Sequence, residues 1–177
     1  MTIQPITVKT MMDTKVFTDF SHFNSFRLNK RWLSLVLFPV IIVAFGFVNL
    51  FTGSRLLFYV FCAAGIVLPL LYLLFYRVSI KKQIVAYQLE IPRCAYTVFL
   101  SKDGVAVSNE KEQAKLDWER VYRVFELDDY TYVYITKARA FILPHRDIAD
   151  GTPEQLHQLF LEYLPSVRLF VKRKNRT

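Results

Sequence analysis

The fold is decided by 32-WLSLVLFPVIIVAFGFVNLF-51 and, after a four-residue link, by 56-LLFYVFCAAGIVLPLLYLLFY-76. Neither block contains a charged residue. About 20 residues at 1.5 Å per helical residue span about 30 Å, the thickness of a bilayer's hydrocarbon core. Backbone groups in lipid need internal partners, so both blocks are expected to be helical. Two adjacent uncharged runs of this length favour transmembrane helices over buried helices of a soluble core.

The flanking charges predict how the hairpin is oriented. A link of only residues 52–55 forces the two helices to run antiparallel. The link carries one cation, Arg55, whereas each outer flank carries three. The outer cations are Arg27, Lys30, Arg31, Arg77, Lys81 and Lys82. Since positive flanks stay in the cytoplasm, both termini of a two-pass protein are expected there. The first block starts too far into the chain for a cleaved signal peptide, so we interpret it as a retained anchor.

Small residues predict where the two helices meet. Small side chains at matched depth allow close approach of helices in lipid. The hypothetical seam consists of Ala44, Gly46, Cys62, Ala63, Ala64 and Gly65. Pro39 and Pro69 each remove a backbone donor and are expected to kink their helices.

The net charge of +8 restricts the class of partner. Basic proteins bind nucleic acid or anionic lipid, or have no charged partner. Here the cations flank the apolar blocks and end the chain, which favours an anionic leaflet over nucleic acid. The candidate lipid contacts are Arg27, Lys30, Arg31, Lys81, Lys82, Lys172, Arg173 and Lys174. For the tail, a solvated terminus is the alternative. Cys62 and Cys94 are expected to lie in different environments, so no disulfide is predicted.

The first 31 residues form a cytoplasmic segment before the hairpin. Residues 3–9 alternate loosely, which suggests a strand. Phe17, Phe20, Phe23 and Phe26 then recur every three residues and cover one broad helical face. That face lies on lipid headgroups or packs against the soluble domain, and the sequence leaves both open.

From about residue 80 the pattern changes to the period of two typical of strands. Strands are predicted at residues 87–89, 95–100, 105–108, 114–117, 121–127, 130–136 and 140–143. Turn signals separate them, among them Asp103-Gly104 and residues 109–112, so the arrangement is an antiparallel meander.

A helix closes this domain, and a tail follows. Thr152, Pro153 and Gln155 form an N-cap, an N1 proline and a capping box, and Pro165 ends the helix. We assign residues 32–77 to the hairpin, 80–165 to the β domain and 166–177 to a basic tail.

Aromatic residues of the domain are interpreted as structural. Trp118 and Phe125 are expected in the core. Tyr130, Tyr132 and Tyr134 share one strand face, which favours half-buried sheet surface over a base-stacking platform.

Residues 114–146 (AKLDWERVYRVFELDDYTYVYITKARAFILPHR) resemble the YcxB-like family of bacterial membrane proteins. The resemblance rests on Trp118 and the hydrophobic strand after it, the aromatic strand from Tyr130, and the run 141–146. The order of parts also fits, so it extends to nearly the whole chain. It implies a domain similar to pleckstrin-homology folds, with seven strands and a C-terminal helix, at a bacterial inner membrane. The resemblance implies no particular activity and assigns no functional residues. His145 departs from the family pattern.

No catalytic constellation stands out. His22, His145 and His157 lack partners at metal-ligand spacing. His145 and Asp147 share a face of an extended chain, but nothing nearby supplies a nucleophile. We therefore expect that the protein is not an enzyme and that it binds no cofactor, metal ion or nucleic acid.

The sequence predicts an α+β membrane protein with a transmembrane hairpin and a small antiparallel domain. Its expected function is that of a membrane-anchored adaptor that contacts a protein partner through an exposed sheet edge, or the headgroup layer. The alternative is an accessory or regulatory subunit of a membrane transport complex that uses the hairpin as its contact. The absence of ionisable groups in the apolar blocks argues against transport by this chain itself.

Overall fold

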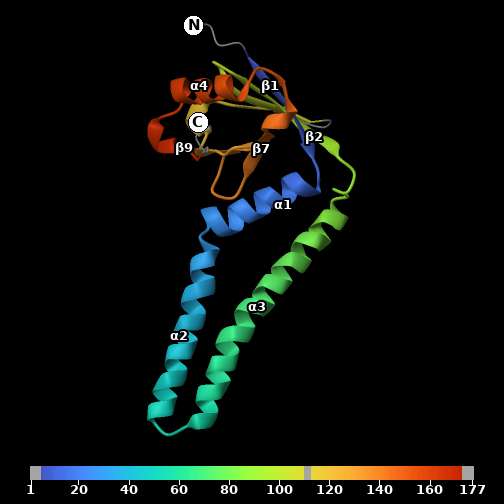
Figure 1. Cartoon of the computed structure of the whole chain (residues 1–177). Helices are drawn as coiled ribbons and strands as arrows, with labels where there is room; N and C mark the ends of the chain where they lie inside the picture. The colour runs from blue at the N-terminus through green and yellow to red at the C-terminus, as the bar shows by residue number, and fades with distance from the viewer. Residues whose placement is uncertain (1–4, 110–112, 173–177) are drawn as a thin grey trace. The chain divides into compact units, whose positions relative to one another are not determined.

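A computed structural model describes residues 5–109 and 113–172 and divides the chain into two compact units (Figure 1). The β domain combines Met1–Asp13 with Pro92–Thr177, and the helical unit is Thr14–Ile91. The α+β class, with two long apolar helices and antiparallel sheets, is confirmed. The division differs from the predicted one, because the first strand belongs to the β domain. The helical unit is therefore an insertion within that domain.

The larger sheet contains the strand that precedes the insertion. Its order is β4-β3-β2-β1-β8, and all neighbours are antiparallel. The strands are β1 (Ile6–Met12), β2 (Arg93–Ser101), β3 (Gly104–Ser108), β4 (Gln113–Leu116) and β8 (Ile148–Asp150). Ile6 pairs with Leu100 and Met12 with Arg93, so β1 and β2 join across the whole insertion. Ile6 and Val8 are fully buried in the core, which explains why β1 docks here.

The smaller sheet has the order β7-β6-β5-β9. Its strands are β5 (Arg123–Glu126), β6 (Tyr130–Tyr134), β7 (Ala140–Pro144) and β9 (Leu169–Val171). β9 runs parallel to β5, and the amide of Lys172 donates to the carbonyl of Glu126 over 2.8 Å. The part of the predicted basic tail that the structure describes is therefore not a solvated terminus, because Leu169–Val171 belong to a sheet. β9 has only three residues, too few for a period of two to be recognised.

The helix α4 (Pro153–Tyr163) completes the core of the β domain. The predicted capping box between Thr152 and Gln155 is confirmed. Leu156, Leu159 and Phe160 pack into one cluster with residues of both sheets and with Trp118, whose indole Nε1 donates to the carbonyl of Ser101 over 3.0 Å.

Two predictions about aromatic residues need correction. Phe125 is half-buried outside the core and stacks on Phe170, with ring centroids 5.0 Å apart. Tyr130, Tyr132 and Tyr134 are buried rather than half-buried, which disfavours a base-stacking role further.

A hydrogen-bonded clamp joins the two sheets at β7. The backbone N–H of Ile142 donates to the hydroxyl of Tyr96 over 2.8 Å, and the buried Thr10 hydroxyl donates to the Ile142 carbonyl over 2.8 Å. Burial raises the pKa of the Tyr96 hydroxyl to about 12, so this hydroxyl keeps its proton well above neutral pH. Side chains from β1 and β2 thus satisfy the β7 edge at this residue.

The helical unit consists of α1 (Thr14–His22), a π-helical turn η1 (Phe23–Leu28), α2 (Arg31–Phe51) and α3 (Arg55–Ala86). α3 continues ten residues beyond the end of the apolar block, and a turn follows it at residues 87–89, so the strand predicted there is wrong. The apolar sequence pattern ends at three cations, but the helix continues through them: Arg77, Lys81 and Lys82. The break comes at Gln88, whose φ of 52° closes a left-handed C-terminal cap with the Leu89 amide donating to the Ile84 carbonyl over 3.0 Å.

The two ends of the helical unit are tied together. The Thr14 hydroxyl donates to the carbonyl of Leu89 over 3.1 Å, and Phe17 packs edge-on against Tyr87. Phe26 packs edge-on against Tyr76 of α3, at 5.1 Å between centroids. These two rings of the phenylalanine stripe therefore pack against α3, a partner that the sequence did not suggest.

Gly46 and Gly65 form the seam between α2 and α3, as predicted. A Cβ at Gly65 would lie 2.7 Å from Val43 Cγ2, and one at Gly46 would lie 3.2 Å from Phe61 Cβ. Ala44 and Ala63 are exposed, so their predicted place in the seam is wrong. Each precedes its seam glycine by two residues, which is a rotation of about 200° around the helix. Cys62 and Ala64 are half-buried.

The seam predicts that Gly65→Leu destabilises the hairpin. The added side chain meets Val43 and overpacks the seam, at a cost of about 1–3 kcal/mol. Thermal unfolding of the full chain in detergent, followed by circular dichroism, measures the loss. Ala63→Leu is the matched control, because Ala63 is exposed on the same helix. Equal melting temperatures for the two variants would contradict this seam.

The clamp predicts that Tyr96→Phe destabilises the β domain. The Ile142 N–H loses its partner, which lowers the free energy of unfolding by about 1–3 kcal/mol. Urea unfolding of the full chain measures the change, with the exposed Tyr59→Phe as control.

The clamp also predicts a pH dependence. Since the folded pKa of Tyr96 lies above 10.0, the unfolded chain loses this proton first. The contribution to stability is complete below pH 10 and is lost as the pH rises towards about 12. Tyr96→Phe should show a smaller loss over this range than the wild type, and an identical loss would contradict the assignment.

Candidate functional site

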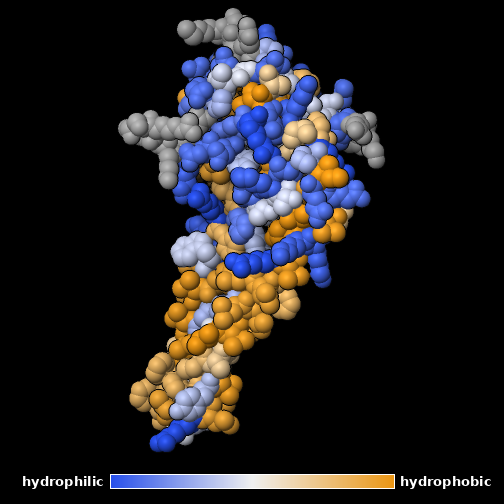
Figure 2. Space-filling view, turned by 45° about the vertical axis from the view of Figure 1, so that its right-hand side comes forward, coloured by the Kyte–Doolittle hydropathy of each residue, from blue (hydrophilic) through white to orange (hydrophobic). Residues whose placement is uncertain are grey.

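The surface of the helical unit is its most unusual feature. α2 and α3 are long and apolar enough to cross a membrane, and 6% of each apolar window is buried inside the structure. Large apolar side chains such as Phe38, Phe45 and Leu70 are exposed. Figure 2 shows apolar residues covering this face of the hairpin and hydrophilic residues at its tip. Apolar surface of this extent on a soluble chain marks an interaction with lipid or with another protein.

A groove opens between the helices on the side away from the link. Its volume is about 480 Å³, and Pro39, Ile42 and Pro69 line its apolar part. Both prolines lie inside helices that continue past them. Arg31 stands at the polar end and donates to the hydroxyl of Tyr72 over 3.3 Å. The groove is therefore apolar along its length and cationic at one end.

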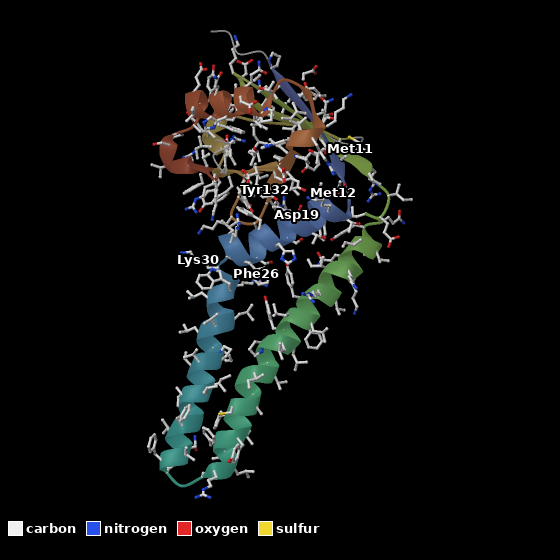
Figure 3. All side chains as sticks on the ribbon, in the orientation of Figure 1. Met11, Met12, Asp19, Phe26, Lys30 and Tyr132 are labelled. Atoms are coloured by element: carbon white, nitrogen blue, oxygen red, sulfur yellow. The ribbon has the colours of Figure 1, made fainter. Side chains whose placement is uncertain are left out.

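The predicted basic contacts fall in different parts of the fold. Arg27, Lys30 and Arg31 are exposed around the start of α2, where Lys30 has a left-handed φ of 49° (Figure 3). Lys81 and Lys82 are exposed on α3 beyond its apolar block. Lys172 follows β9 in the β domain and is exposed. Arg173 and Lys174 lie outside the described residues. The structure thus gathers the first five at the open end of the hairpin.

The histidines make structural contacts. Nε2 of His145 lies 3.0 Å from the hydroxyl of Thr131, and Nδ1 lies 2.9 Å from the carbonyl of Asp128. Asp147 instead accepts from the Met11 amide, at 2.8 Å. The His–Asp pair considered from the sequence is therefore not formed. Thr131 is fully buried, so a substrate has no access to its hydroxyl.

A second pair joins α4 to the smaller sheet. Nδ1 of His157 lies 2.7 Å from Oε2 of Glu126, which is fully buried. The pair connects the helix to β5, with the carboxylate buried and the imidazole partly exposed. Over residues 5–109 and 113–172, no group of three His, Cys, Asp or Glu residues is placed to hold a metal ion.

A pocket lined by arginines escaped the sequence reasoning. It has a volume of about 330 Å³ and lies between η2 (Trp118–Arg120), the start of β5 and η4 (Ser166–Arg168). Arg120, Arg123 and Arg168 line it, together with Glu119. Arg120 and Arg168 are 48 positions apart, so no local motif announces the cluster. In the sequence Arg168 lies far from the other two arginines, so the positions alone do not predict that the three line one pocket.

Comparison with known protein families gives one match, which lies within the β domain. Residues 100–160 match the family model of the YcxB-like protein. The resemblance predicted from residues 114–146 is thereby confirmed. The YcxB-like region runs from the end of β2 into α4, so it includes β3 to β8 but neither β1 nor the hairpin. No curated protein and no solved structure matches the chain.

The buried pair of the YcxB-like region predicts that His157→Ala destabilises the fold. The variant removes the bond to a buried carboxylate, which lowers the free energy of unfolding by about 1–3 kcal/mol. Urea unfolding of the full chain measures it, and Gln158→Ala, exposed on the same helix, is the control. If His157→Ala unfolds like the control, the pair has no structural role.

Proposed function

We propose that the chain is a membrane-anchored, non-enzymatic adaptor of the bacterial cytoplasmic membrane. In this proposal α2 and α3 cross the bilayer as a hairpin, and the β domain is a pleckstrin-homology-like module on the cytoplasmic side. One observation carries it: two exposed apolar helices form an insertion between the adjacent strands β1 and β2.

The insertion supports the two-pass topology. β1 precedes the hairpin and β2 follows it, and the two strands are paired along their length. They form one sheet only if both lie on the same side of the membrane, which requires an even number of crossings. The exposed cations at the open end, opposed by Arg55 alone at the link, favour the cytoplasm for that side.

The order of the strands supports a pleckstrin-homology-like domain. Two antiparallel meanders, β1–β4 and β5–β7, are followed by a helix that packs into their shared core. The match of residues 100–160 to the YcxB-like model agrees with this reading.

The free edges of the larger sheet support a binding role. β4 is an outer strand, and Gln113, Ala114 and Lys115 are exposed. An exposed edge pairs readily with an extended peptide. Tethering to the membrane raises the effective concentration of a partner in the same membrane, so a weak contact suffices. The histidine contacts described above give no nucleophile and base accessible to a substrate, which favours binding over catalysis.

The alternative, a subunit of a transport complex, is supported by the exposed apolar surface of the hairpin. It differs from the adaptor in the surface that contacts the partner. A photo-crosslinking residue at Lys115 reports on β4, and one at Leu70, which is 61% exposed, reports on the hairpin.

The adaptor predicts protein crosslinks in native membranes from position 115 and lipid crosslinks from position 70. The transport subunit predicts protein crosslinks from position 70. The chain should remain in the membrane pellet after an alkaline wash, and a fluorescent protein fused after Thr177 should fluoresce in the cytoplasm. Recovery in the supernatant, or an externally active phosphatase fusion at Thr177, would overturn the proposed anchoring.

A further inference from the structure

The arginine pocket of the β domain has the properties of a binding site. Its volume of about 330 Å³ falls in the usual range of small-molecule sites. Its lining includes Glu119, Arg120, Arg123, Ile135, Val167 and Arg168. All of these residues belong to the β domain.

Arg168 is held in place by the backbone. Its Nη1 donates to the carbonyls of Glu119 and Val121, over 2.9 and 3.0 Å. These bonds tie η4 to η2 and use the donors of one nitrogen. A guanidinium carries five N–H donors, so the remaining donors are not needed for this tie.

Arg123 is held by aromatic rings. Its guanidinium carbon lies 5.0 Å from the centroid of Tyr122 and 5.7 Å from that of Phe170. A guanidinium stacked on a ring directs its N–H donors outward in its own plane. Two of the three arginines are therefore positioned before any ligand arrives, which lowers the entropic cost of binding.

The charge around the pocket is unbalanced. Three arginines face one glutamate, a surplus of two positive charges. Within the described part of the chain, no ion pair neutralises Arg120, Arg123 or Arg168. Ile135, which lines the pocket, begins the β6–β7 turn that carries Lys137 and Arg139, and its amide donates to the Arg139 carbonyl over 3.0 Å. An anionic ligand would relieve the mutual repulsion of these cations.

The apolar side chains around the pocket favour a lipid headgroup over free phosphate as the source of the anion. Val167 at the pocket is 81% exposed, and Phe170 and Val171 of β9 are exposed beside it. Apolar side chains next to cations suit the boundary between headgroups and acyl chains. The fork of a guanidinium matches the oxygens of a phosphate.

We propose that the pocket formed by Arg120, Arg123 and Arg168 binds the phosphate of an anionic phospholipid headgroup. The choice of lipid over free phosphate rests on the proposed membrane anchoring. The phosphate chemistry itself rests on the β domain alone.

The test uses the full chain reconstituted in phosphatidylcholine nanodiscs and immobilised on a biosensor surface. The probes are vesicles of equimolar phosphatidylglycerol and phosphatidylcholine, vesicles of phosphatidylcholine alone, and inorganic phosphate. Wild type should bind the anionic vesicles and not the neutral ones. Arg120→Ala/Arg123→Ala should weaken this binding by about tenfold or more, at roughly the contribution of two cations near an anionic surface.

Lys102→Ala/Lys115→Ala is the matched control, since it removes the same charge from exposed positions in the β2–β3 turn and on β4. It should change binding by about threefold at most, because charges away from the contact act only through a screened field. Arg120→Lys/Arg123→Lys keeps the charge but loses the guanidinium fork, so it should bind more tightly than the double-alanine variant and more weakly than the wild type. Thermal unfolding of each variant verifies that the domain is folded.

The possible outcomes test the phosphate site and the membrane anchoring separately. Binding of inorganic phosphate that depends on the pocket, without binding of anionic vesicles, would support the phosphate site and assign it to free phosphate. Equal losses in the two double-alanine variants, or no binding of either probe, would overturn the site. If the chain fails to enter nanodiscs, the anchoring fails, and titration of phosphate into the detergent-free chain still tests the pocket.

Discussion

The pairing of β1 with β2 is the constraint on which the rest of the structure depends. Met12 and Arg93 are register partners, yet the entire helical unit lies between them in the sequence. Closing so long a loop costs conformational entropy when the loop is flexible. The helical unit reduces this cost because its own ends are joined, through Thr14 and Leu89 and through Phe17 and Tyr87. The insertion is thus an ordered hairpin whose ends already lie together.

The same constraint restricts the topology. Because β1 and β2 are paired along their length, the insertion must return to the edge of the sheet from which it leaves. An antiparallel pair of helices meets this requirement, and a single long helix does not. Gly46 and Gly65 allow the two helices to approach closely, because neither position has room for a side chain.

In the β domain, local sequence signals determine single turns and helix ends, whereas long-range contacts hold the sheets and α4 together. The Asp103-Gly104 turn and the Thr152 capping box are local, and each sets one connection or one helix end. The Tyr96 clamp and the His157–Glu126 pair join residues distant in sequence, and they hold the two sheets and α4 in one core. The arginine pocket depends on the same kind of long-range packing, because Arg168 of η4 bonds to the carbonyl of Glu119 in η2, and the adjacent β9 pairs with β5.

The sequence by itself determined the two apolar helices, most strands of the meanders, the capped α4 and Gly46 and Gly65 of the seam. Each depends on hydrophobic periodicity, turn chemistry or residue size within a short window. Only the tertiary structure decided that β1 belongs to the later domain, that α3 continues to Ala86, that Leu169–Val171 forms a strand, and that Arg120, Arg123 and Arg168 share a pocket. These features depend on partners far along the chain, and a short strand or a single arginine carries no local mark of the partner it will find.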